Sequence, residues 1–174
     1  MKQNFLILLT ITASVAMAQS GDKQKQIIED SKEAKTAFIK QDGKMAGLFT
    51  KTYGYVIFPN IGKGGIGLGA ATGNGTVFEN GKMIGMGKMT QVSIGLQLGG
   101  QSYREVVFFE TAKDMKRFKE NNVEFSAQVS AVAASAGASA NAKYVEGVLV
   151  FTMQKGGLMY EASVGGQKFK FTSF

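Results

Sequence analysis

Hydrophobic and polar residues alternate with a period of two in the middle of the chain, between Tyr53 and Gln101. The clearest run has apolar side chains at every second position, separated by serine, glutamine or glycine: Val92, Ile94, Leu96 and Leu98. This alternation is typical of a half-buried β-strand. Asn80-Gly81 lies between two apolar runs, and both residues tolerate the positive φ angles of a two-residue type I′ turn. We therefore predict a glycine-rich antiparallel sheet here, which residues 102–174 extend.

Two segments have a helical pattern instead. Between Lys25 and Gln41, small and apolar residues recur on one narrow stripe, and Asp42-Gly43 follows as a stop signal. A second, short helix is expected from Ala112 to Asn121. Thr111 can cap its first turn, and Met115 and Phe118 give it one apolar side. We expect both helices to pack on the sheet.

The C-terminal third predicts further strands. Alternation from Phe125 to Ala133 continues into a run of Ala, Ser, Gly and Asn, which we interpret as a long strand with little side-chain volume. Strands are also expected over residues 145–153, 158–164 and 167–174. In the last of these, Phe169 and Phe171 share one face, while the two lysines of that strand share the other.

The fold class that these elements predict is α+β, with a single domain over residues 25–174. Its centre is a twisted, strongly curved, mainly antiparallel glycine-rich sheet of six to nine strands, either open or barrel-like. The helix that ends near Gln41 and the short helix after Thr111 complete the domain.

Four sequence motifs in this order resemble the SYLF domain family: Gly54–Pro59, Gly64–Gly67, Ser93–Gln101 and Val106–Phe109. The later SAQVSAVAASAGASA segment is similar to the small-residue strand of that family, and the resemblance covers roughly residues 25 to 165. SYLF relatives bind phosphoinositides and other acidic lipids. The resemblance therefore implies a non-enzymatic domain that binds acidic phospholipid at a membrane surface. The actin-related roles in this family belong to eukaryotic proteins, and nothing in the sequence supports transferring them to an exported bacterial domain.

The N-terminal segment has the pattern of a secretory signal peptide. Lys2 precedes an apolar run that begins at Phe5, and Ala16-Met17-Ala18 fits the small-x-small cleavage pattern. We predict that residues 1–18 are a signal peptide and that the protein is exported, periplasmic or secreted, and peripheral to a bacterial membrane. The chain has no cysteine, so it cannot carry the acylated N-terminal cysteine of a lipoprotein.

Catalytic chemistry has little support in the sequence. Histidine and cysteine are both absent, which removes the commonest general base and the commonest metal ligands. The run Gly62–Gly67 imitates a dinucleotide-binding fingerprint, but the glycine-rich residues after it do not favour the helix which that fingerprint needs. Glu105 and Glu161 remain as an unexcluded pair of carboxylates. We expect no enzyme activity, no cofactor and no metal.

The net charge of +7 favours an acidic partner. Export makes nucleic acid improbable, so an anionic lipid or membrane surface is the expected partner. Seven basic residues in three places are the candidates: Lys113, Lys116, Arg117 and Lys119 on the short helix, Lys168 and Lys170 on the last strand, and Lys63 in the glycine turn. We rank the helix first, because acidic residues dilute the charge of the helix before it. An envelope structural or protein-interaction domain, with an envelope protein as partner, is the alternative.

Overall fold

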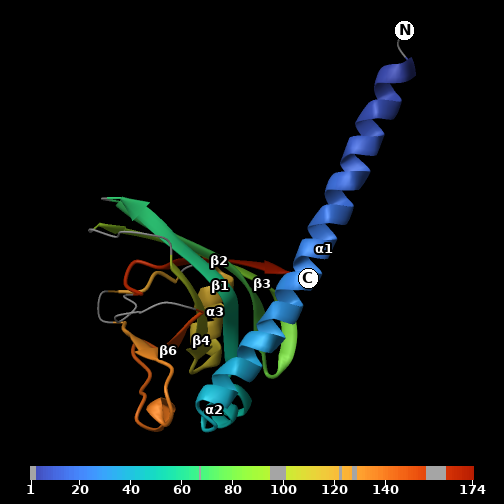
Figure 1. Cartoon of the computed structure of the whole chain (residues 1–174). Coiled ribbons are helices and arrows are strands. Elements are labelled where there is room, and N and C mark those ends of the chain that lie inside the picture. Colours follow the sequence, from blue (N-terminus) through green and yellow to red (C-terminus); the bar gives the residue numbers. More distant parts are fainter. Residues whose placement is uncertain (1–2, 67, 95–100, 122, 127–128, 156–163) are drawn as a thin grey trace.

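The computed structural model describes residues 3–66, 68–94, 101–121, 123–126, 129–155 and 164–174. Three α-helices, seven strands and one 3₁₀ turn follow one another in these residues (Figure 1). In chain order they are α1 (Gln3–Gln41), α2 (Met45–Lys51), β1 (Gly54–Ile66), β2 (Leu68–Glu79), β3 (Lys82–Ile94), β4 (Gln101–Phe109), α3 (Ala112–Lys119), β5 (Ala131–Ala133), η1 (Ala138–Ala140), β6 (Val148–Gln154) and β7 (Lys168–Ser173).

The seven strands form one open sheet in the order β5-β6-β4-β1-β2-β3-β7. Every pair is antiparallel except β5 with β6, which is parallel. The predicted turn between β2 and β3 is confirmed, since Asn80 and Gly81 have φ angles of 49° and 75°. The α+β fold class is confirmed as well, whereas the barrel-like alternative is wrong because the sheet does not close on itself.

The sheet has a hydrophobic core on each face. On one face, α1 and α2 place Phe38 and Phe49 against Tyr55 of β1 and its neighbours. On the other face, α3 places Met115 and Phe118 against the opposite side of β1, β2 and β4, and the segment around Phe125 extends this cover. The domain therefore has three layers, with the sheet in the middle (Figure 1).

Glycine lets aromatic rings approach the sheet closely. A side chain at Gly75 would overlap the carbonyl oxygen of Ile57, and its Cβ would lie 2.8 Å from the ring of Phe58. At Gly87, a Cβ would lie 3.0 Å from Val56 and 3.6 Å from the ring of Phe118. These glycines leave the space that the core on the α3 face fills, as expected for strands that need close backbone approach.

The small-residue segment differs from its prediction. Among its described residues, Ala131–Ala133 alone pair as a strand, and a 3₁₀ turn follows at Ala138–Ala140. The carboxylate of Asp42 accepts hydrogen bonds from the backbone N–H of Ser139 at 2.8 Å and from its hydroxyl at 2.6 Å, and thereby fixes a turn rather than an extended chain. Residues 127–128 and most of the strand predicted over 158–164 lie outside the described residues.

The first helix begins at Gln3 rather than at Lys25 and runs without a break to Gln41. Ser31 fixes its orientation on the sheet, because its buried hydroxyl accepts a hydrogen bond of 3.0 Å from Thr76 of β2. Among the described residues, no helix combines the length and the apolar character needed to cross a bilayer.

Candidate functional site

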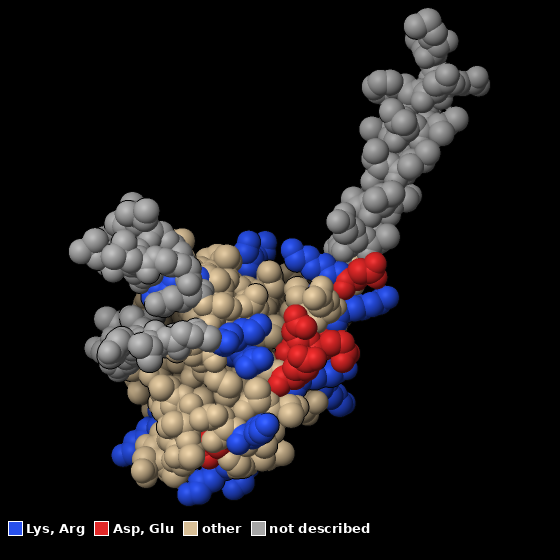
Figure 2. All heavy atoms as spheres, viewed as in Figure 1, with Lys and Arg blue, Asp and Glu red and all other residues tan. Residues whose placement is uncertain are grey.

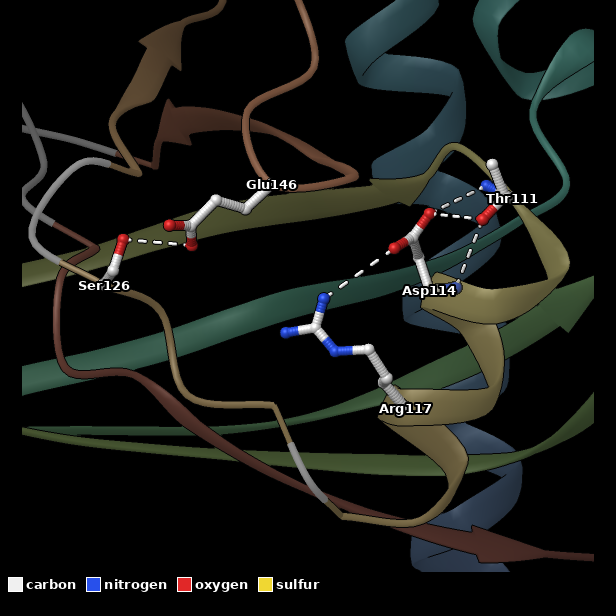
Figure 3. A network of polar contacts seen from close by, with 5 residues as sticks. All are labelled: Thr111, Asp114, Arg117, Ser126 and Glu146. Atoms are coloured by element: carbon white, nitrogen blue, oxygen red, sulfur yellow. Dashed lines mark hydrogen bonds and ion pairs between the residues drawn. The ribbon is translucent and has the colours of Figure 1, made fainter.

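The short basic helix α3 is built and placed as its sequence predicts. Thr111 and Asp114 form a reciprocal capping box, in which each side chain bonds the backbone N–H of the other residue, at 3.3 Å and 3.2 Å (Figure 3). Met115 and Phe118 have no exposed surface, so they anchor the helix to the sheet. Lys113, Lys116 and Arg117 of this helix are not among the buried residues, whereas Lys119 reaches the end of β2.

Most of these cations have an acidic neighbour, however. Lys119 makes an ion pair of 2.9 Å with Glu79 of β2. Arg117 lies 3.8 Å from Asp114, and Figure 3 shows its guanidinium directed toward that carboxylate. Lys116 lies 3.7 Å from Glu120. Among the described residues, Lys113 is the one member of the four without such a pair, so the net charge of this cluster is much smaller than its sequence indicates.

The three other predicted lysines do not form one surface. Lys63 of β1 stands opposite Ala71 of β2, and its side chain lies on the α3 face of the sheet. Lys168 and Lys170 of β7 stand opposite Thr90 and Lys88 of β3, on the α1 face. Lys168 also lies 3.4 Å from Glu124. Lys63 and Lys170 thus lie on opposite faces of the sheet, and Lys170 is grouped with other lysines instead.

Lys170 lines a groove of about 450 Å³ between the open part of the sheet and α1, which we call the lysine groove. Its basic residues come from three elements, namely Lys23 of α1, Lys88 of β3 and Lys170 of β7. Asn74 and Thr172 add polar groups, and Ile27 and Met86 add apolar ones. The hydrogen bond between Ser31 and Thr76 fixes α1 on the sheet. The turns of α1 before Ser31 carry Lys23 and Ile27, which line one wall of this groove.

The lysine groove gathers three positive charges that have no acidic partner among the described residues. Lys88 and Lys170 are directly opposite each other on neighbouring strands, an arrangement that is destabilising for like charges. In the part of the chain that the structure describes, none of the three lysines has an acidic side chain within ion-pair distance. Asp30 lines an adjoining hollow that also includes Lys23. The grouping of Lys23, Lys88 and Lys170 suits an anionic ligand that lies between them.

The rest of α1 carries more balanced charge. Figure 2 shows acidic side chains gathered over the part of α1 that lies on the domain, with basic residues around them. Within α1, Lys25 pairs with Asp22 at 3.9 Å and Lys32 pairs with Glu29 at 2.6 Å. The outer surface of α1 is therefore a poorer anion site than the lysine groove beside it.

A group of buried polar residues lies on the opposite face. The sequence indicated Glu105 as one of two carboxylates, but it did not indicate the contact with Gln167. Glu105 of β4 and Gln167 have no exposed surface, and Gln167 donates a hydrogen bond of 2.9 Å to Glu105 Oε2. Burial raises the pKa of the Glu105 carboxyl to about 7, although the hydrogen bond from Gln167 opposes this shift. Burial also raises the pKa of Tyr103 nearby, with the charge of Glu105 as a second cause. The alternation of Tyr103, Glu105 and Val107, all of which are buried, is a sequence signal that could have placed Glu105 on a buried face.

Glu161, the second member of the carboxylate pair considered from the sequence, lies outside the described residues. Among the described residues, no three His, Cys, Asp or Glu side chains are grouped so that they could hold a metal ion.

Comparison with known proteins finds one family and one individual protein to which the chain is similar. Residues 90–173 match the model of the Ysc84 family, described as a Las17-binding protein actin regulator. The chain is also 30% identical over 124 residues to Beta cell expansion factor A from Aeromonas veronii. This alignment covers 70% of the chain and 47% of the relative, so the chain spans about half the length of that protein.

Proposed function

Since residues 90–173 carry a SYLF (Ysc84) domain, we propose that this protein binds, without catalysis, to membrane surfaces that contain acidic phospholipid. The family match confirms the resemblance seen in the glycine-rich motifs. Membership of this family supports a lipid-binding or actin-regulatory domain. The choice of acidic phospholipid comes from the charges of this particular chain.

The observation that carries the proposal is the lysine groove. Three lysines on two strands and a helix line one depression, and no acidic side chain of the described residues pairs with them. A basic side chain near an anionic membrane contributes about 1 kcal/mol, so three contribute about 3 kcal/mol. At 1.4 kcal/mol per tenfold change, this corresponds to roughly a 150-fold increase in partitioning.

The polarity of the groove also suits a lipid surface. Ile27 and Met86 are partly exposed between the lysines, so a lipid can meet apolar and cationic groups together. The long stems of Lys88 and Lys170 leave their ammonium groups free to reach the phosphate level of a bilayer. Together with the predicted signal peptide, these features favour a peripheral protein on a membrane outside the cytoplasm.

The test is flotation of the protein with vesicles of two compositions, phosphatidylcholine alone and phosphatidylcholine with an equal part of phosphatidylglycerol. We expect recovery with the acidic vesicles and little recovery with the neutral ones, and we expect added salt to reverse the binding. Equal recovery with both vesicles, or none with either, would favour the alternative of an envelope structural or protein-interaction domain.

A further inference from the structure

We propose that Glu105 and Gln167 form a latch that holds the start of β7 on the sheet, and that ionisation of Glu105 loosens this latch. Because β7 carries Lys170, the lysine groove would then be better assembled in acid than above neutral pH. The functional consequence rests on the proposed lipid binding, whereas the latch itself can be measured without lipid.

The surroundings of Glu105 are poorly suited to a negative charge. Its neighbours in register are Phe58 of β1 and Thr152 of β6, both of which are neutral and buried. The titratable group beside it is the phenol of Tyr103, which is itself buried and uncharged at neutral pH. No lysine or arginine of the described residues pairs with the Glu105 carboxylate.

Hydrogen-bond acceptors outnumber donors around Glu105, although the single bond from Gln167 itself favours the ionised carboxylate. Gln167 Nε2 donates to one carboxyl oxygen, while the other oxygen, Oε1, has no hydrogen-bond partner among the described residues. The side-chain oxygen of Gln167 is likewise buried without a partner there. Acceptors are therefore in excess, and a proton on Glu105 adds a donor at this point. An ionised carboxylate would instead be buried with a single hydrogen bond.

Hydration of an ionised Glu105 would first require movement of the segment that leads into β7, because Gln167 of that segment contacts the carboxyl group. Gln167 is the residue immediately before this strand. Its carbonyl accepts a hydrogen bond of 3.0 Å from the backbone N–H of Phe125, and Gly166 donates one of 2.8 Å to the Phe125 carbonyl. Gln91 of β3 donates a bond of 2.9 Å to the carbonyl of Gly165. Residues 164–167 are thus held next to Glu105 by a small number of hydrogen bonds.

Strand β7 is the element that can respond. It lies at the edge of the sheet, where it pairs with β3 on one side and has a single bridge, between Lys168 and Glu124, on the other, whereas β4, which carries Glu105, is paired with a full strand on both sides. An edge strand opens at lower free energy than a central one because fewer contacts are lost. Opening of β7 separates Lys170 from Lys88 and removes one side of the lysine groove.

The direction of the pH effect follows from the raised pKa of Glu105. When the latch is open, the carboxyl is hydrated and titrates near its ordinary pKa of about 4.3. Below that pH, both states are protonated and the latch has its full stability. As the pH rises toward 7, the open state loses its proton first, so the opening equilibrium increases, and it levels off above the closed-state pKa of about 7. Between pH 5 and pH 8, this linkage increases opening roughly 70-fold.

The experiment is native-state hydrogen exchange, read by mass spectrometry over pH 5 to 8, on the full chain and on Glu105→Gln. After correction for intrinsic exchange rates, we expect opening of residues 168–173 to increase roughly 70-fold in the wild type and to stay nearly constant in the variant. Peptides from β1 and β2, which do not pair with β7, serve as the internal reference. Equal pH dependence in both proteins, or an equal increase in β1 and β2, would overturn the latch.

A second measurement does not depend on the variant. Titration of the Glu105 carboxyl carbon by NMR should give a midpoint near pH 7 in the wild type, and an ordinary midpoint would contradict the proposal. Flotation with phosphatidylglycerol vesicles at pH 5 and pH 8 tests the link to function. Equal binding at both pH values, with β7 opening at pH 8, would show that the latch does not control the groove. Failure to bind at either pH would reject lipid binding and leave the latch to be judged by exchange.

Discussion

Replacement of Gly75 by alanine tests the claim that glycine in β2 permits close packing on the sheet. The new Cβ would overlap the carbonyl oxygen of Ile57 in β1 and lie 2.8 Å from the ring of Phe58. Ile57 pairs with Thr76 in the adjacent register position, just before a register shift, so its carbonyl cannot move away without disturbing that pairing. The Phe58 ring is fully buried and has little room to rotate.

The expected loss of stability can be bounded from these contacts. Added volume in a packed core costs about 1–3 kcal/mol, and we expect the upper end because one of the contacts is with backbone. For a domain of this size, 3 kcal/mol corresponds to a decrease of roughly 10 °C in Tm. Urea unfolding followed by circular dichroism measures the free-energy change directly.

Gly62→Ala is the matched control for this variant. Gly62 lies in the neighbouring strand β1, and no heavy atom comes within 4 Å of a Cβ built there. Its replacement should leave the free energy of unfolding within about 0.5 kcal/mol, or raise it slightly through the lower entropy of the unfolded chain. If both variants have the same stability, close packing at Gly75 is not the reason for glycine, and our explanation of the glycine-rich strands is wrong.

Three further predictions concern single contacts, each measured by urea unfolding. Asp42→Ala should lose about 1–3 kcal/mol, because the bonds from Ser139 lower the pKa of Asp42; this contribution is present above pH ~4 and is lost as the pH falls through the lowered pKa. Thr111→Ala should lose about 1 kcal/mol with the cap of α3, and Thr111→Ser should restore most of it. Lys119→Gln should lose no more than about 1 kcal/mol, because its pair with Glu79 is partly exposed; a larger loss would mean that the pair holds α3 to β2.

Features set by neighbouring residues were predictable from the sequence. The Asn80-Gly81 turn, the capping box of Thr111 and the alternating faces of β7 each depend on a few adjacent positions. Local chemistry decides such features, so a single sequence is enough to predict them. The prediction failed for the Ala-rich segment, because Asp42, which fixes its turn, is distant in the sequence.

The candidate site was only partly predictable for the same reason. The sequence indicated Lys170 as a candidate, but its partnership with Lys88 depends on the register between β3 and β7, and that with Lys23 depends on how α1 crosses the sheet. The prediction that α3 is the main lipid-binding cluster stays a prediction. The helical pattern did not reveal that the charge of Lys119 is paired, because its partner Glu79 lies in β2, distant from α3 in the sequence.

The most direct test compares two variants that each lose three positive charges, Lys23/Lys88/Lys170→Gln in the lysine groove and Lys113/Lys116/Arg117→Gln on α3. Partitioning onto phosphatidylglycerol vesicles should fall roughly 150-fold for the groove variant, at about 1 kcal/mol for each cation, and about fivefold for the α3 variant, in which Lys113 alone lacks an acidic partner among the described residues. Circular dichroism and urea unfolding would confirm that both variants are folded. A groove variant that binds like the wild type, together with an α3 variant that does not, would contradict our account and identify α3 as the membrane-binding surface.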